Sequence, residues 1–279
     1  MFERIGNGLR LTQQSFSVLT ANKRLLVFPL FSAIACMAVF GSFMVPLMAS
    51  DFLTASETGE VGVGAVGYLL MFAFYLTTYF VIIFFNTAIV ECSIMYFRGQ
   101  NPSVSDGLKG AINRLPQIAK WALLAATVGV ILRSLEQRAG ALGRFAVGLI
   151  GMAWSAATFF VVPVLVMERL GPIDATKRST AIVKKTWAES LSAHIGIGVI
   201  AGILYFISAL AVGGGVYFLF NDNTGLGLTL ASVGVISFIV VALAATAMQA
   251  IVTSALYMYA GQGVVPDQFE EETLNRVFG

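Results

Sequence analysis

The sequence predicts an all-α membrane protein, a polytopic bundle of six transmembrane helices with amphipathic helices on its cytoplasmic surface. Two observations predict this fold class. Only 11% of the 279 residues are charged, whereas soluble domains carry about 25%, and the mean hydropathy is +0.83. In addition, several charge-free runs reach the length of about 20 apolar residues that a helix needs to cross a bilayer.

Six apolar runs give the expected spans. Five are long enough by themselves, and the third, around Trp121, needs help from its flanks. We expect the last run to form one long helix, because no turn signal interrupts residues 228–260. The expected spans cover approximately residues 25–49, 64–94, 115–133, 145–167, 193–220 and 225–260.

The distribution of Lys and Arg predicts the orientation, because cytoplasmic loops carry an excess of these residues. Four lie in residues 1–24, four in 91–120 and five in 168–189, against none in 51–60. This pattern predicts a multi-pass membrane protein with both termini in the cytoplasm. The exception is a group of three arginines in residues 133–144, on the predicted outer side.

Three basic segments, each ahead of a pair of spans, are predicted to be amphipathic helices at the membrane surface. Each has a stripe of residues three and four positions apart, which share one helical face. In the second segment, Ser103-x-x-Asp106 also resembles a capping box. The stripes are Phe2, Ile5, Leu9, Thr12, Phe16 and Leu19; Val104, Leu108, Ala111, Leu115 and Ile118; and Ile173, Thr176, Thr180, Val183 and Trp187.

The three segments align loosely, which predicts an internal repeat of surface helix plus helical hairpin. The proposed repeat units are residues 2–97, 98–170 and 171–260, all within one membrane domain, 1–279. Chance similarity is the competing explanation. Residues 261–279 form an acidic cytoplasmic tail, which either docks a partner or is disordered.

Short motifs spread over nearly the whole chain carry a family resemblance. They are Phe84-Phe85-Asn86, Trp121-Ala122-Leu123, Thr127-Val128-Gly129, Phe159-Phe160-Val161-Val162-Pro163-Val164, Gly171-Pro172, Lys177-Arg178-Ser179 and Thr186-Trp187. With these motifs the chain resembles a family of prokaryotic integral membrane proteins known only as a domain of unknown function. The resemblance implies a six-span inner-membrane protein, and it supplies no activity, substrate or site residue.

Polar residues within spans are candidate functional groups, because they are costly in lipid. Arg133, Glu136 and Arg138 either close the top of the bundle through salt bridges or line a vestibule that attracts anions or lipid headgroups; snorkelling to the interface is a third explanation. Arg133 and Glu136 are spaced to pair on one helix. We expect Glu91 to pair with Arg98 or with a base of a surface helix, or to relay protons.

Asn86 and Gln249 are the other polar candidates, and each amide needs a hydrogen-bond partner in lipid. They are candidate partners for one another. Two glycine motifs also stand out: Gly213-Gly214-Gly215, which permits close packing or a bend, and Gly198-x-x-x-Gly202, which fits a helix-contact face.

Exposed bases at the span ends are candidate contacts for anionic lipid headgroups, each worth roughly 1 kcal/mol near the surface. With spans at both ends of these segments, lipid is a nearer partner than nucleic acid. A homo-oligomer or a membrane protein partner stays open. The candidate bases are Lys23, Arg24, Lys109, Lys177, Arg178, Lys184 and Lys185.

Catalytic and metal motifs are absent from the sequence. His194 is the one histidine, whereas zinc sites need three or four ligands, and there is no nucleophile–base pair. We therefore expect a non-enzymatic protein without cofactor or metal. Its expected role is membrane organisation, lipid handling or partner scaffolding; the alternative is a transporter or channel for a hydrophobic or lipidic substrate.

Overall fold

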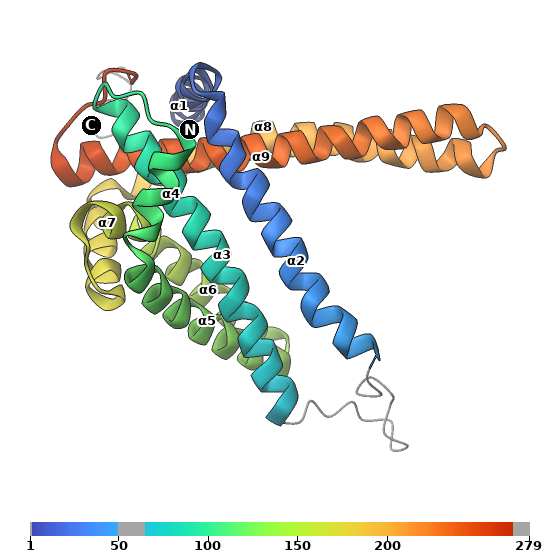
Figure 1. Ribbon diagram of the computed structural model, residues 1–279, viewed down its shortest axis with the longest axis horizontal. Coiled ribbons are helices and arrows are strands. Elements are labelled where there is room, and N and C mark those ends of the chain that lie inside the picture. Colours follow the sequence, from blue (N-terminus) through green and yellow to red (C-terminus); the bar gives the residue numbers. More distant parts are fainter. Residues whose placement is uncertain (1, 50–64, 270–279) are drawn as a thin grey trace. The chain divides into compact units, whose positions relative to one another are not determined.

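The computed structural model describes residues 2–49 and 65–269, with the side chains of residues 8–45, 67, 69–184 and 196–269. The secondary structure of these residues is helical, without a strand, and this confirms the predicted all-α fold class. The elements are α1 (Phe2–Ala21), the 3₁₀ helix η1 (Lys23–Leu26), α2 (Val27–Ala49), α3 (Ala65–Phe97), α4 (Val104–Ile112), α5 (Leu115–Arg138), α6 (Ala141–Ala157), α7 (Val161–Glu168), α8 (Pro172–Phe220) and α9 (Thr224–Gln262) (Figure 1).

Six segments in the described part are long and apolar enough to cross a membrane, as predicted. The last of them, α9, is one uninterrupted helix of 39 residues, which confirms the expectation of a single long helix. The six segments are Lys23–Val45, Leu69–Phe97, Leu115–Arg138, Ala141–Glu168, Gly196–Phe220 and Thr224–Gln262.

The chain divides into two compact units that alternate along the sequence. Unit 1 comprises Met1–Pro29, Ser93–Asn101 and Lys185–Gly279, and unit 2 comprises Leu30–Cys92 and Pro102–Lys184. The single domain and the three repeats stay predictions. Of the acidic tail, residues 270–279 lie outside the described part of the chain.

In unit 1, α1 packs against α9, and α8 returns into α9 through a short turn to form an antiparallel hairpin (Figure 1). Glycines let the two helices of the hairpin approach closely. A Cβ on Gly215 would lie 2.5 Å from the backbone N of Ala231, and one on Gly234 would lie 2.8 Å from the carbonyl O of Ser208. The hydroxyl of Ser208 also donates to that of Ser237 at 3.0 Å.

The glycine predictions had mixed outcomes. Gly215 of the Gly213-Gly214-Gly215 motif does pack closely against α9. Around Gly198 and Gly202 the described residues give no sign of a contact face, because Cβ atoms there would have no neighbour within 4 Å, and that part stays a prediction. Spacing alone does not tell which face of a helix meets a neighbour.

In unit 2, aromatic rings join neighbouring spans. Phe74 of α3 makes edge-to-face contact with Phe43 of α2, with ring centroids 5.6 Å apart. Trp121 of α5 stacks on Trp154 of α6 at 6.0 Å. Such pairs add about 0.5–1.5 kcal/mol beyond area burial.

The segment before α5 contains the predicted capping box. The Ser103 hydroxyl accepts the backbone N–H of Asp106, and the Asp106 carboxylate accepts the Ser103 N–H. The expectation of one apolar face through this segment needs correction, because a break separates α4 from α5 and leaves Leu115 exposed. Pro116 causes the break: it has no N–H to continue the helix.

The predicted fourth span is interrupted. A turn at residues 158–160 separates α6 from α7, because Pro163 lacks an N–H and its ring clashes with the carbonyl of Phe159, four residues earlier. The buried Ser179 hydroxyl accepts the N–H of Phe160 at 2.9 Å. The turn is therefore held by α8.

The basic segment at 172–190 is not a separate helix. It runs without a boundary into the fifth span as α8, since residues 173–195 contain neither Gly nor Pro. Its predicted apolar stripe is only partly correct: Val183 is buried as predicted, whereas Ile173 is 64% exposed and the buried face begins with Ala175, Ser179 and Ile182. The side chain of Trp187 lies outside the described residues. Small side chains at 175 and 179 allow the close approach to the α6–α7 turn.

Candidate functional site

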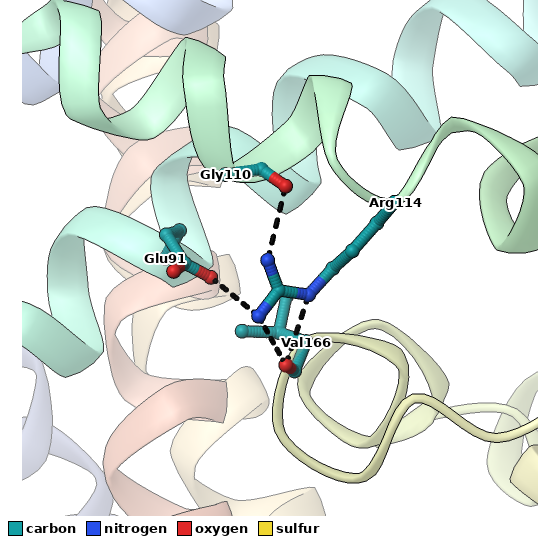
Figure 2. Close-up of polar contacts among 4 residues, drawn as sticks. All are labelled: Glu91, Gly110, Arg114 and Val166. Carbon is teal, nitrogen blue, oxygen red and sulfur yellow. Dashed lines mark hydrogen bonds and ion pairs between the residues drawn. The ribbon is translucent and has the colours of Figure 1, made fainter.

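The most elaborate polar site of unit 2 is built around Arg114, at the junction of α4 and α5 (Figure 2). Its Nε and Nη2 donate to the carbonyl O of Val166 at 2.9 and 2.6 Å, and Nη1 donates to the carbonyl O of Gly110 at 3.0 Å. Nη2 also lies 3.3 Å from Oε2 of Glu91 on α3. One guanidinium thus joins α3, α4 and α7.

The carbonyls of Gly110 and Val166 can accept hydrogen bonds from Arg114 because both lie at the ends of helices. The last four C=O groups of a helix have no partner within it. Gly110 lies in the last turn of α4 and Val166 in the last turn of α7. The positive charge of Arg114 is also favourable at these negative ends of the helix dipoles.

The ion pair between Arg114 and Glu91 matters for stability because much of it is buried. Arg114 is 8% exposed, and this burial lowers the pKa of its guanidinium, while the negative charge of Glu91 raises it. Oε2 of Glu91 is buried and has no hydrogen-bond partner among the described residues. The carboxylate therefore depends on its ion pair with Arg114.

Gly110 is required at the junction for space. A Cβ there would lie 2.5 Å from Cγ and 2.8 Å from Cδ of Glu91. The missing side chain lets α4 approach α3 closely enough for Arg114 to reach the carboxylate.

The predicted pairing of Glu91 with a base of a surface segment is confirmed, and the base is Arg114. Arg114 itself was missed as a site residue. Its partner Val166 lies 52 positions away, and no sequence pattern predicts that contact. An arginine between a capping box and Pro116 was the available signal of a helix junction.

For the polar group at the end of α5, which consists of Arg133, Glu136 and Arg138, one part of the prediction is confirmed. Nη1 of Arg133 contacts Oε2 of Glu136 at 3.0 Å, which confirms the predicted pair. Both side chains are about half exposed, and Arg138 is exposed in the last turn of α5. Whether they close a bundle or line a vestibule stays a prediction.

The intramembrane amides Asn86 and Gln249 belong to different units, so the proposed hydrogen bond between them stays a prediction. Asn86 is half-buried in α3 and Gln249 is exposed on α9. The backbone carbonyl of Gln249 accepts the Thr253 hydroxyl at 2.7 Å.

The candidate lipid-contacting bases fall into two groups. Lys177 and Arg178 have acidic partners: Lys177 lies 3.6 Å from Asp174, and Arg178 lies 2.8 Å from Glu168. The exposed bases that form no ion pair with another described residue are Lys23, Arg24, Lys109 and Lys184. The side chain of Lys185 lies outside the described residues.

A family model matches residues 65–266, more than half of the chain. The chain belongs to DUF6159, a family of unknown function. The DUF6159 match begins at the first residue of α3 and contains the Arg114 junction and every motif of the family resemblance, whereas α1, η1 and α2 precede it. No curated protein matches the chain. The prokaryotic origin implied by the resemblance stays a prediction.

Proposed function

We propose that this protein is a non-enzymatic, multi-pass inner-membrane protein that binds anionic lipid headgroups of the cytoplasmic leaflet and acts in lipid handling or membrane organisation. Six candidate spans support an integral membrane protein. The proposal that both termini are cytoplasmic follows from the Lys and Arg distribution.

One observation carries the proposal: bases at the span ends are exposed and lack an acidic partner within the described chain. Of the candidate bases named from the sequence, Lys109 on α4 and Lys184 on α8 meet this description in unit 2. Lys23 and Arg24 stand where the first span begins. Free bases at such positions are attracted to anionic headgroups, whereas bases neutralised by carboxylates are attracted less.

Native mass spectrometry of the protein released from nanodiscs of mixed phosphatidylglycerol and phosphatidylcholine tests this proposal. We expect retained phosphatidylglycerol, reduced in the Lys109→Gln/Lys184→Gln variant. The matched control is Arg133→Gln/Arg138→Gln, which removes the same charge from the end of α5. Equal retention of both lipids by the wild type would contradict the proposal, and loss only in the control would favour the vestibule.

The alternative, a transporter of a hydrophobic or lipidic substrate, is favoured by the interrupted span. Non-helical backbone at membrane depth is tolerated where protein or an aqueous cavity covers it, and broken helices form substrate sites in many transporters. The turn between α6 and α7 is such a break. However, Phe160 is fully buried and its N–H is bound by Ser179, which supports a structural turn.

The transport alternative is tested with liposomes that contain fluorescently labelled phosphatidylglycerol and an impermeant quencher. Transport predicts movement of the label between leaflets above that in protein-free liposomes. Its loss in Arg133→Ala/Glu136→Ala would locate the path at that pair. No movement with the wild type would leave the non-transport role as the better account.

A further inference from the structure

From residue 8 onward the N-terminal helix α1 has three faces, and the described part of the stripe predicted from the sequence is divided between two of them. The side chains of Phe2 and Ile5 lie outside the described residues. One face packs against the protein: Leu11, Ser15 and Leu19 are at most 3% exposed. Thr12 of the predicted stripe also lies on this face, with its hydroxyl bonded to the Gly8 carbonyl. The packing is close, since a Cβ on Gly196 of α8 would lie 2.5 Å from that carbonyl.

The second face is apolar and is not covered by the described part of the chain. Leu9 is 41% and Phe16 53% exposed. Seven positions apart, they lie on the same side of a helix with 3.6 residues per turn. The remaining face is polar and exposed, and it carries Arg10, Gln13 and Ser17.

The position of α1 in the chain restricts what covers the apolar face. α1 ends at Ala21, and the candidate first span begins at Lys23. Lys23 and Arg24 are exposed there, as bases are where a span meets the headgroups. Because one residue separates α1 from this span, the C-terminal end of α1 lies at the boundary between lipid and water. An apolar face beside a polar, basic one is the pattern of a helix that lies in that boundary.

We infer that α1 lies in the interfacial plane of the bilayer, with Leu9 and Phe16 among the acyl chains and with Arg10, Gln13 and Ser17 toward water. The occupant of the apolar face is lipid. The inference rests on the proposed function for the location of α1 at a membrane surface, and it adds the rotation of the helix and the residues that enter the bilayer.

Site-directed spin labelling tests the rotation. Single cysteines replace Leu9, Phe16, Gln13 and Ser17 in turn, in a Cys36→Ala/Cys92→Ala background, and the protein is reconstituted in phosphatidylcholine vesicles. Collision with oxygen reports lipid exposure, and collision with a nickel chelate reports water exposure. We expect a higher oxygen-to-nickel ratio at positions 9 and 16 than at positions 13 and 17.

Two results would overturn the inference. Equal ratios at the four positions would show that the side with positions 9 and 16 does not face lipid in preference to the side with positions 13 and 17. Shielding of positions 9 and 16 from both reagents would show that another protein, or a second copy, covers them. Because phosphatidylcholine vesicles carry no net charge, this test does not depend on a preference of the protein for anionic lipid. If positions 9 and 16 show the higher ratios but the protein retains no more phosphatidylglycerol than phosphatidylcholine, the proposed function is refuted and this inference stands.

Discussion

Replacing Arg114 by Met tests the energetic role of the junction. The variant keeps an unbranched side chain of similar reach and removes the charge. It takes away the three hydrogen bonds to the Gly110 and Val166 carbonyls and leaves the buried Oε2 of Glu91 without its cation. The second loss is the greater, because this charged oxygen has no other partner among the described residues and water does not reach it.

The expected magnitudes follow from these contacts. Breaking a buried ion pair by removing one partner costs about 3–5 kcal/mol. In Arg114→Met/Glu91→Met the orphaned charge disappears, and the remaining cost is the two uncapped carbonyls, about 1–3 kcal/mol. We therefore predict that the double variant is more stable than Arg114→Met, although it carries one more substitution.

Reversible unfolding in mixed micelles with increasing sodium dodecyl sulfate, followed by tryptophan fluorescence, measures these differences. Trp121 and Trp154 stack in unit 2 and supply the signal. Glu91→Gln is the matched control, because it removes the carboxylate charge and keeps the arginine bonds to the carbonyls; we expect a smaller loss than for Arg114→Met. A double variant that is as unstable as the sum of the single variants would refute the reasoning.

Three further predictions use the same protein. Ser179→Ala should destabilise the protein by about 1–3 kcal/mol, because its hydroxyl accepts a buried N–H. Ser15→Ala should be neutral or stabilising, because the equally buried Ser15 hydroxyl has no partner among the described residues; two losses of equal size in the unfolding titration would contradict this. Gly110→Ala should destabilise by about 1–3 kcal/mol through overpacking against the glutamate of the ion pair, and an unchanged midpoint would show that the glutamate moves aside freely. Hydrogen bonds from the hydroxyl and the backbone N–H of Ser103 lower the pKa of Asp106, so its contribution to stability is present above its unfolded pKa and is lost as pH falls through the lower folded value. Ser103→Ala removes the hydroxyl bond, so carbon NMR titration should show this pKa rising toward the ordinary value, and no change would exclude the hydroxyl bond as its cause.

Features that depend on local sequence were predicted well. Span number follows from apolar length, and the capping box and the Arg133–Glu136 pair each depend on residues three positions apart. The long helix α9 follows from the absence of a turn signal. In each case the physical cause lies within a few residues, and the sequence displays it directly.

Features that depend on neighbours in space were not predicted. The interruption before Pro163 was missed because a proline near a span end is often tolerated, and the hydroxyl that stabilises the turn comes from α8. The exposed Ile173 and the divided stripe of α1 have a common cause. Periodicity shows that a helix has faces, whereas the packing partner decides which face is covered.

We propose above all that Lys109 and Lys184, in the basic segments that precede spans, lie on the cytoplasmic side, and that Arg138, at the end of α5, lies on the outer side. Single cysteines at Lys109, Lys184 and Arg138 are labelled with a membrane-impermeant maleimide in intact and in permeabilised cells, in the Cys36→Ala/Cys92→Ala background. The account predicts labelling at position 138 in intact cells, and labelling at 109 and 184 only after permeabilisation. Labelling of 109 or 184 in intact cells would contradict it.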